Sequence, residues 1–233
     1  ALIERDTDGQ NFSDLSVVRS GLSYLTDLGI NALELLPPAD SFYRREWGYG
    51  TTNFSAPDHE LGFPEGNSSP TANSDLTALI VACHKNNIRF FVDMVMAFCK
   101  QGSFQCLNFD DFHINKPENN QNDPDALTSA RNNGTKEVRN GFGSSLFRYA
   151  KEVNDAYDPI SGTKKALFPA RQYMMTYLVR WMIDFHIDGI RLDSIENVFN
   201  WDFMRDFKDF ARNLWNQRWN SQGLSTPSSE ANS

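Results

Sequence analysis

Apolar residues follow two patterns along the chain: a spacing of three or four positions, and continuous runs. In the first, apolar residues recur every three or four positions: Leu15, Val18, Leu22, Leu25 and Leu28. Gly29 follows, and the apolar run 30–36 comes directly after it. The first pattern predicts an amphipathic helix that ends at a glycine, and the run predicts a buried strand.

The same order of helix and strand occurs twice more. A helical stripe over 76–83, with Ser74 placed to cap it, ends at Asn86 and Asn87 before the apolar run 88–95. Another stripe over 174–185 precedes a turn at 188–189 and the run 190–195. A last amphipathic stripe begins at Trp201, and we expect its helix to end near Trp215.

Strands that are apolar throughout and alternate with helices are typical of a parallel sheet covered by helices. The sequence therefore predicts an α/β fold. Two long connections, 37–73 and 99–169, leave the carboxyl end of a predicted strand. Ligand sites of parallel α/β folds lie at that end, so both connections are expected to build a site. The second is rich in Asn, Asp and Gly, and predicts a small subdomain.

Length and charge narrow the classes of partner. The 233 residues fit one large domain or two small ones, and the net charge is −8. This charge disfavours nucleic acid and anionic membranes as partners. The sequence has no run of about 20 apolar residues, the length that a membrane helix needs. The three cysteines match no metal-binding spacing, and we expect them to be free thiols, which favours a cytoplasmic protein. N-x-S/T triplets, such as the one at Asn53, leave secretion open.

Charged residues interrupt the predicted strands. They are Glu34 in LELLPP, Asp93 in FFVDMVM, and Arg191 with Asp193 in GIRLDS. Charges inside buried strands are costly unless they are paired. One interpretation is an ion pair that joins neighbouring strands. The other is an arginine that keeps a carboxylate ionised as a nucleophile at the mouth of the sheet.

Four stretches carry a resemblance to a known family. LGINALELLPPADSF, WGYGTTNFSAPD, FFVDMVMAF and DGIRLDSIENV resemble, in order, sequence regions of the α-amylase superfamily, glycoside hydrolase family 13. The second is similar to branching, debranching and maltooligosyl-type members. The resemblance implies a (β/α)8 TIM barrel with a domain inserted after the third strand, and a retaining glycosidase that acts on glucan polysaccharides.

The resemblance also implies a partial barrel of about four β/α units. Residues 1–98 would form units one to three, with residues 2–5 ending the first strand, and 99–168 would form the insert. Unit four would span 169–216, and 217–233 would be a polar tail. Because such a barrel has open sheet edges, we expect self-association or a tail that folds back.

Site residues follow by position. The resemblance implies that Asp193 is the nucleophile, that Arg191 orients it, and that Asp93 organises the site. Tyr49 would stack on the sugar, and Trp47 beside it would extend this aromatic platform. Phe98 and Asn197 stand where many members carry histidines, and are expected to contact substrate.

Two departures from the family bear on chemistry. Where members carry an Asn-His pair after Asp93, this chain has Ala97 and Phe98, which cannot ligate calcium through their side chains. We therefore expect the usual calcium site to be absent or remade, and no other cofactor or metal.

The second departure concerns the general acid. Retaining hydrolysis needs two carboxyl groups roughly 5–5.5 Å apart. The family's acid lies on a fifth strand, for which we find no motif. Glu196 is the best local candidate, although it also suits a helix first turn. Asp58 and Glu46 come next, and Glu230 lies in a Ser-rich segment. The alternative function is carbohydrate binding without catalysis, or an inactive fragment of a larger glycosidase or branching enzyme.

Overall fold

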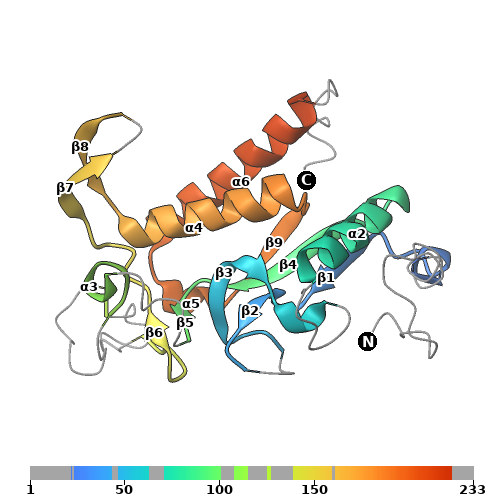
Figure 1. Ribbon diagram of the computed structural model, residues 1–233, viewed down its shortest axis with the longest axis horizontal. Helices are drawn as coiled ribbons and strands as arrows, with labels where there is room; N and C mark the ends of the chain where they lie inside the picture. Colours follow the sequence, from blue (N-terminus) through green and yellow to red (C-terminus); the bar gives the residue numbers. More distant parts are fainter. Residues whose placement is uncertain are drawn as a thin grey trace, which may run out of the picture.

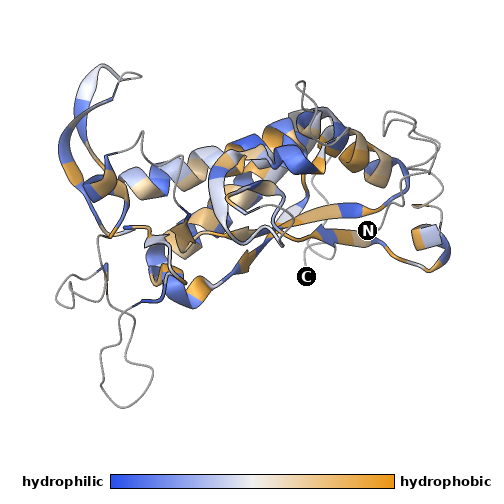
Figure 2. Ribbon diagram, turned by 60° about the horizontal axis from the view of Figure 1, so that its bottom comes forward, coloured by the Kyte–Doolittle hydropathy of each residue, from blue (hydrophilic) through white to orange (hydrophobic). Residues whose placement is uncertain are grey.

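A three-stranded parallel sheet forms the centre of the protein. The computed structural model describes residues 22, 24–43, 47–62, 71–100, 108–114, 125–126, 139–158 and 161–221. The strand order is β1 (Ala32–Leu35), β4 (Arg89–Val95), β9 (Gly189–Asp193). Helices α2 (Ala72–Lys85), α4 (Pro169–Val179) and α6 (Trp201–Ser221) lie on one side of these strands (Figures 1 and 2). The predicted α/β class is confirmed.

The two outer strands of this sheet differ from the central one. In β4, Phe90, Val92 and Met94 are buried. In β1, Glu34 is exposed beside its partner Phe91, and the flanking Leu36 is exposed too. The expectation of a buried strand over 30–36 is therefore wrong in extent and in burial. The physical reason is position, because β1 is an edge of the sheet that the described residues form.

The predicted helix over 76–83 is present as α2, but it begins earlier. Thr71 is its N-cap, and the Thr71 hydroxyl donates to Asp75 Oδ2 at 2.6 Å. Ser74 is not the cap, because it lies inside the helix and donates to the Thr71 carbonyl. The predicted end is confirmed, with Asn86 as the C-cap and Asn87 in the left-handed region at φ 58°.

An aromatic cluster attaches a short antiparallel hairpin to the helices. The hairpin consists of β2 (Ala39–Ser41) and β3 (Thr51–Pro57), and the 3₁₀ turn η1 (His59–Leu61) follows it. Phe54 packs edge-on against Phe147, Tyr173 and Tyr177. Trp181, in the π-helical turn η4 (Arg180–Asp184) that continues α4, donates to the Phe54 carbonyl at 2.8 Å.

Helix α6 is longer than its apolar pattern predicts. We expected an end near Trp215, but the helix continues to Ser221. Arg218 explains the extension, since its guanidinium donates to Asp188 Oδ1 and to the Ile187 carbonyl, both at 2.8 Å. Residues 217–221 are therefore helical, and the boundary at 216 does not separate a tail.

The predicted excursion 99–168 returns to the end of β4. It holds α3 (Phe109–Phe112) and a hairpin of β7 (Val153–Asp158) and β8 (Thr163–Leu167) that projects from the body of the molecule (Figure 1). Strand β5 (Phe98–Cys99) pairs with β6 (Ser145–Leu146), and the Phe147 amide donates to the Ala97 carbonyl at 2.9 Å. The excursion therefore packs at the carboxyl end of the sheet.

The first strand, the cysteines and the membrane helices were also the subject of expectations. The expected first strand at residues 2–5 lies outside the described residues. Of the three cysteines, Cys83 and Cys99 are free and buried, and Cys106 lies outside the described part. No helix among the described residues has the length and apolarity needed to cross a membrane.

Candidate functional site

The register of β4 and β9 brings the predicted charges together. Asp93 pairs with Arg191, and Val95 pairs with Asp193, so both strands end at the same edge of the sheet. Arg191 Nη1 lies 2.7 Å from Asp93 Oδ2 and 2.8 Å from Asp193 Oδ1. One guanidinium nitrogen thus bridges two carboxylates, one from each strand. The predicted pairing of Arg191 with Asp93 or Asp193 occurs with both.

Tyr49 completes this charged group. It lies just before β3, and its hydroxyl donates to Asp93 Oδ2 at 2.7 Å. Burial, and the hydrogen bond to Asp93, raise the pKa of Tyr49 to about 12, so it remains a donor at neutral pH. The hydrogen bond to Asp93 also raises the pKa of Arg191. Asp93 is 2% exposed, and its Oδ1 has no hydrogen-bond partner among the described residues.

A cavity of about 740 Å³ lies above the charged group. One wall is the strand end, residues 191–196, which includes Asp193 and Glu196. A second is the loop between β2 and β3, with Tyr43 and Tyr49. The third comes from the excursion, with its residues Lys100, Phe142 and Ser144 next to Phe98. The volume suits a small-molecule or sugar ligand, and aromatic rings beside carboxylates suit a carbohydrate.

Most predicted site residues meet at this cavity. Arg191, Asp193, Glu196, Tyr49 and Phe98 line it, and Asp93 lies in contact with two of them. Two predicted binding residues do not line it. Trp47 is 74% exposed, and Asn197 is buried among main-chain groups.

Several lining residues escaped the sequence analysis, among them Tyr43, Lys100 and Phe142. Tyr43 stands in the aromatic segment SFYRREWGYG, and could have been chosen with Tyr49 on that ground. Lys100 and Phe142 carry no such signal, because they reach the cavity through the path of the excursion. Phe142 also has φ 49°, in the left-handed region, which no sequence pattern predicts for a phenylalanine.

Backbone strain is found directly after the predicted nucleophile. Ser194 has φ 54° and ψ 34°, and it follows Asp193 at the start of the short helix α5 (Ile195–Val198). A left-handed conformation of a non-glycine residue persists only where its surroundings impose it, and such residues cluster at functional sites. The turn directs residues 194–196 along the cavity wall.

The candidate acids fall in different places. Glu196 is exposed, lies in the first turn of α5 and lines the cavity, so the structure allows both interpretations given above. Asp58 caps η1, where its Oδ1 accepts from the Glu60 amide at 2.8 Å, and it does not line the cavity. Glu46 and Glu230 lie outside the described residues.

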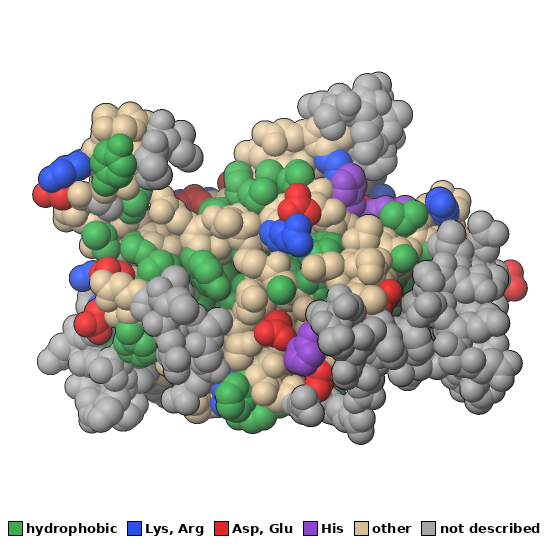
Figure 3. Space-filling model, in the orientation of Figure 1, with side chains coloured by type: hydrophobic (Ala, Val, Ile, Leu, Met, Phe, Trp, Pro, Cys, Tyr) green, Lys and Arg blue, Asp and Glu red, His purple; other side chains and the backbone are tan. Residues whose placement is uncertain are grey.

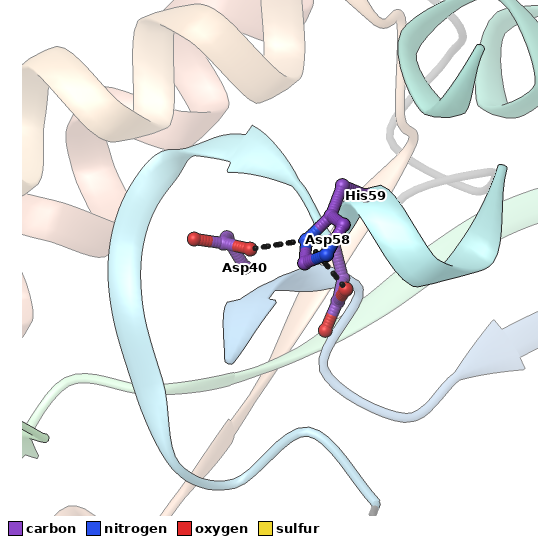
Figure 4. A group of neighbouring side chains, drawn as sticks. All are labelled: Asp40, Asp58 and His59. Atoms are coloured by element: carbon purple, nitrogen blue, oxygen red, sulfur yellow. Dashed lines mark hydrogen bonds and ion pairs between the residues drawn. The ribbon is translucent and has the colours of Figure 1, made fainter. Parts of the chain in front are cut away.

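A separate cluster of potential metal ligands lies at the base of the β2–β3 hairpin. Potential ligand atoms of Asp40, Asp58 and His59 lie within 4.8 Å of one another (Figure 4). On the molecular face of Figure 3, acidic and histidine side chains gather over β2, β3 and η1. His59 Nδ1 is 3.4 Å from Asp40 and 3.7 Å from Asp58. The Asp40 carboxylate accepts a hydrogen bond from the Thr52 hydroxyl, and the Asp58 carboxylate accepts one from the Glu60 amide. These hydrogen bonds close the base of the hairpin and account for the positions of both carboxylates.

The chain is similar to several known proteins. A family profile described as the alpha amylase catalytic domain matches residues 5–222. The 1,4-alpha-glucan branching enzyme GlgB 2 of Streptomyces avermitilis is 26% identical over 204 residues, which are 87% of this chain and 28% of that enzyme. The branching enzyme GlgB of Hydrogenovibrio crunogenus is 23% identical over 221 residues, 95% of this chain and 25% of that enzyme. The chain thus spans about a quarter of the length of these relatives.

Solved structures show the same fold. The alpha-amylase from Geobacillus thermoleovorans, complexed with acarbose, matches with a TM-score of 0.56 at 19% identity, over 88% of this chain and 38% of that one. The pullulanase from Anoxybacillus sp. LM18-11, complexed with maltotetraose, matches with a TM-score of 0.59 at 19% identity, over 83% of this chain and 25% of that one. At this identity the likeness concerns the fold.

Proposed function

This chain belongs to the alpha-amylase catalytic-domain family, and we propose that it is the part of a glucan-acting enzyme that carries the nucleophile, Asp193. The observation that carries the proposal is the bridge made by Arg191. Its Nη1 contacts Asp93 and Asp193 together, and Asp193 lies on the wall of a cavity with aromatic residues. Two relatives are 1,4-alpha-glucan branching enzymes, which supports a glucan substrate.

In the proposed reaction the Asp193 carboxylate attacks the anomeric carbon of a bound glucan. A bond forms between Asp193 and that carbon, the glycosidic C–O bond breaks, and the leaving oxygen takes a proton from an acid. A water or a sugar hydroxyl then gives a proton back to that acid, now a base, and displaces Asp193, so that the configuration is retained. Water gives hydrolysis, and a sugar hydroxyl gives chain transfer.

Each residue of the charged group has a role in this scheme. The Arg191 guanidinium holds Oδ1 of Asp193, which leaves the other carboxylate oxygen to act as the nucleophile. Asp93 and Tyr49 fix the guanidinium, Asp93 by its ion pair and Tyr49 through Asp93. The rings of Tyr49 and Phe98 pack against the sugar.

Glu196 is our candidate for the acid. It is exposed on the same wall as Asp193, three residues further along the chain. General acid catalysis requires a group held within reach of the leaving oxygen. A glucan that binds between the walls would bring its glycosidic oxygen between these two carboxyl groups.

The wider architecture is also part of the proposal. We assign β1, β4 and β9 to strands two, three and four of a (β/α)8 barrel, with 99–168 as its insert. No metal or other cofactor enters the scheme. Leu28, Ile30 and Leu36 are exposed beside β1, and a second copy of the chain would cover these apolar side chains. Light scattering should therefore detect a species heavier than the monomer, and a monodisperse monomer would contradict this self-association.

A second candidate is glucan binding without turnover. The observation behind it is the cavity itself, whose volume and aromatic lining suit a sugar whether or not Asp193 reacts. The two candidates share the ligand and differ in the chemistry of Asp193.

One experiment separates them. Reducing-sugar release and branching should be measured on starch and pullulan with the natural chain, Asp193→Asn and Glu196→Gln. The matched control is Asp202→Asn, on the exposed face of α6. The enzyme predicts a rate lower by roughly 1,000-fold or more in Asp193→Asn, because covalent catalysis is lost, and an unchanged control. If Glu196 is the acid, Glu196→Gln should lose activity on starch but keep much of it on an aryl glucoside, whose leaving group departs without a proton.

Binding is the second measurement. A chain without activity that still binds maltoheptaose, with affinity lost in Tyr49→Ala, is a binding module. A chain that neither binds nor cleaves glucans contradicts both candidates.

A further inference from the structure

A buried arginine joins the excursion to the segment that follows the proposed nucleophile. Arg139 is 3% exposed. Its guanidinium donates to three main-chain carbonyls: Nε to Asn197, and Nη1 to Asp125 at 2.6 Å and to Phe147 at 3.1 Å. These carbonyls belong to three segments that are distant in the sequence. A buried charge is tolerated only when it is well bonded, so this convergence is a structural centre.

Asn197 makes the same connection from the other side. Its Oδ1 accepts from the Asn140 amide, and its Nδ2 donates to the Ser194 hydroxyl, both at 2.9 Å. Ser194 is the left-handed residue directly after Asp193. Arg139 and Asn140 are neighbours in the excursion, so two adjacent residues bind one residue of α5. This explains why Asn197, which we expected to contact substrate, is buried instead.

The loop anchored in this way carries a wall of the cavity. The Phe142 amide donates to Asn140 Oδ1 at 2.8 Å, and its carbonyl accepts from Lys100 Nζ at 3.5 Å. Phe142 lines the cavity with its side chain 61% exposed, despite a left-handed backbone. An exposed phenylalanine in a strained conformation requires external support, and the support begins three residues earlier at Arg139.

Main-chain carbonyl oxygens that converge from several segments are also typical ligands of calcium. The family resemblance leads one to expect calcium near Ala97, whose carbonyl accepts from the Phe147 amide. The residues here do not fit that ion, because Ala97 and Phe98 offer no side-chain oxygen. The oxygens of Asp125, Phe147 and Asn197 meet a guanidinium instead. A guanidinium supplies one positive charge, remains ionised at all relevant pH values, and cannot be removed by a chelator.

We propose that Arg139 is a built-in cation that takes the structural place of a metal ion, holding the Phe142 wall of the cavity against the strand end that carries Asp193. Arg139 is a positioning residue. It is not among the residues that line the cavity, and it acts through Asn197 and the loop 139–147. Its effect on glucan binding rests on the proposed function, whereas its structural effect does not.

The first test uses the natural chain. Its melting temperature, and hydrogen exchange in 139–147 and 194–199, should be the same in EGTA and in added calcium. A melting temperature that falls in EGTA and returns with calcium would overturn the proposal, because a metal ion would then occupy this structural role.

The second test uses substitutions. Arg139→Met removes the charge with little change in length, and Arg139→Lys keeps the charge without the fork. Arg205→Met, on the exposed surface of α6, is the control. Exchange in both segments should rise by roughly 10- to 100-fold in Arg139→Met, since three buried acceptors lose their donor. Arg139→Lys should recover part of this protection, and the control should equal the natural chain.

The remaining outcomes are also decisive. If Arg139→Met does not fold, Arg139→Lys and the chelator test still decide. The proposal would be overturned if Arg139→Lys and Arg139→Met both left hydrogen exchange unchanged in either of the two segments. Where glucan binding exists, Arg139→Lys should weaken it more than it lowers kcat. If coupled protection is found without glucan binding, the proposed function fails and the role of Arg139 stands.

Discussion

The two ends of the β4–β9 pair each hold an aspartate and an arginine, and the two groups differ in how completely they are bonded. At the amino end, Asp188 Oδ2 lies 2.7 Å from His84 Nε2 and accepts from the Phe90 amide at 2.8 Å, while Oδ1 accepts from Arg218. At the carboxyl end, Asp93 Oδ1 has no partner among the described residues.

This difference shows what the same residue types do in two settings. The amino-end group uses both carboxylate oxygens to join α2, β4 and α6, which stabilises the fold. The carboxyl-end group leaves acceptor capacity unused next to a cavity, and Asp193 is 34% exposed there. The unpaired Asp93 Oδ1 is buried and costly to the fold, whereas the partly exposed Asp193 carboxylate is available to a substrate.

Removing the aspartate at the amino end should have the largest effect on stability, and removing the one at the carboxyl end should have a much smaller effect. Asp188→Ala should lower the free energy of unfolding by about 3 kcal/mol, because it leaves Arg218 and the Phe90 amide without their acceptor. Asp193→Ala should lower it by less than about 1 kcal/mol, because Arg191 keeps Asp93 and is partly solvated. Urea unfolding measures both. Equal losses of unfolding free energy in the two variants would mean that both groups stabilise the fold to the same degree.

Arg191→Lys sharpens the carboxyl end. An ammonium group on a shorter, flexible chain cannot hold Asp93 and Asp193 with the fixed geometry of a guanidinium. We expect glucan cleavage to fall by roughly 100-fold through misplacement of Asp193, while the midpoint of urea unfolding changes little. Steady-state kinetics should show the loss in kcat, and Arg205→Lys on α6 is the matched control. A loss confined to KM would contradict the positioning role.

Acid should weaken the amino end through Asp188. Burial opposes ionisation of this carboxyl, but the hydrogen bonds from His84 and Phe90 and the nearby positive charges outweigh it, so its pKa is lowered. A lowered pKa means that the stabilisation is present above about pH 3.9, the usual value for aspartate, and is lost as the pH falls through the folded-state pKa. The stability difference between the natural chain and Asp188→Asn should therefore shrink between pH 5 and pH 2, in urea titrations at each pH. A constant difference would exclude Asp188 as the source.

Tyr49→Phe should have the smallest effect of the four. It removes one hydrogen bond to Asp93 and keeps the ring on the cavity wall. We expect a loss of about 1 kcal/mol in unfolding free energy, or about a fivefold fall in kcat if the hydroxyl holds Asp93 for catalysis. Glucan affinity should hardly change, and Tyr43→Phe is the control. A large loss of affinity would mean that the hydroxyl contacts the sugar directly.

Local sequence was sufficient for much of the fold and for the charged group. The apolar run 88–95 predicts β4 because most of its residues are buried, and the spacing of Arg191 and Asp193 places both on one face of a strand. Predictions failed where the neighbours decide burial. The run 30–36 looks as apolar as 88–95, but β1 lies at an edge and exposes Glu34. The apolar stripe of the last helix ends before Arg218, whose polar contacts with Asp188 extend that helix.

The amino-acid sequence by itself determined the α/β class, the order of helices and strands, and the identity of Asp93, Arg191 and Asp193 as the charged group. It did so because periodicity and local spacing act over a few residues. Only the tertiary structure decided that Phe142 and Lys100 form a wall of the cavity, and that Asn197 is buried. It also decided that Arg139 binds three distant carbonyls. These outcomes depend on contacts between segments far apart in the chain, and such contacts leave no local pattern.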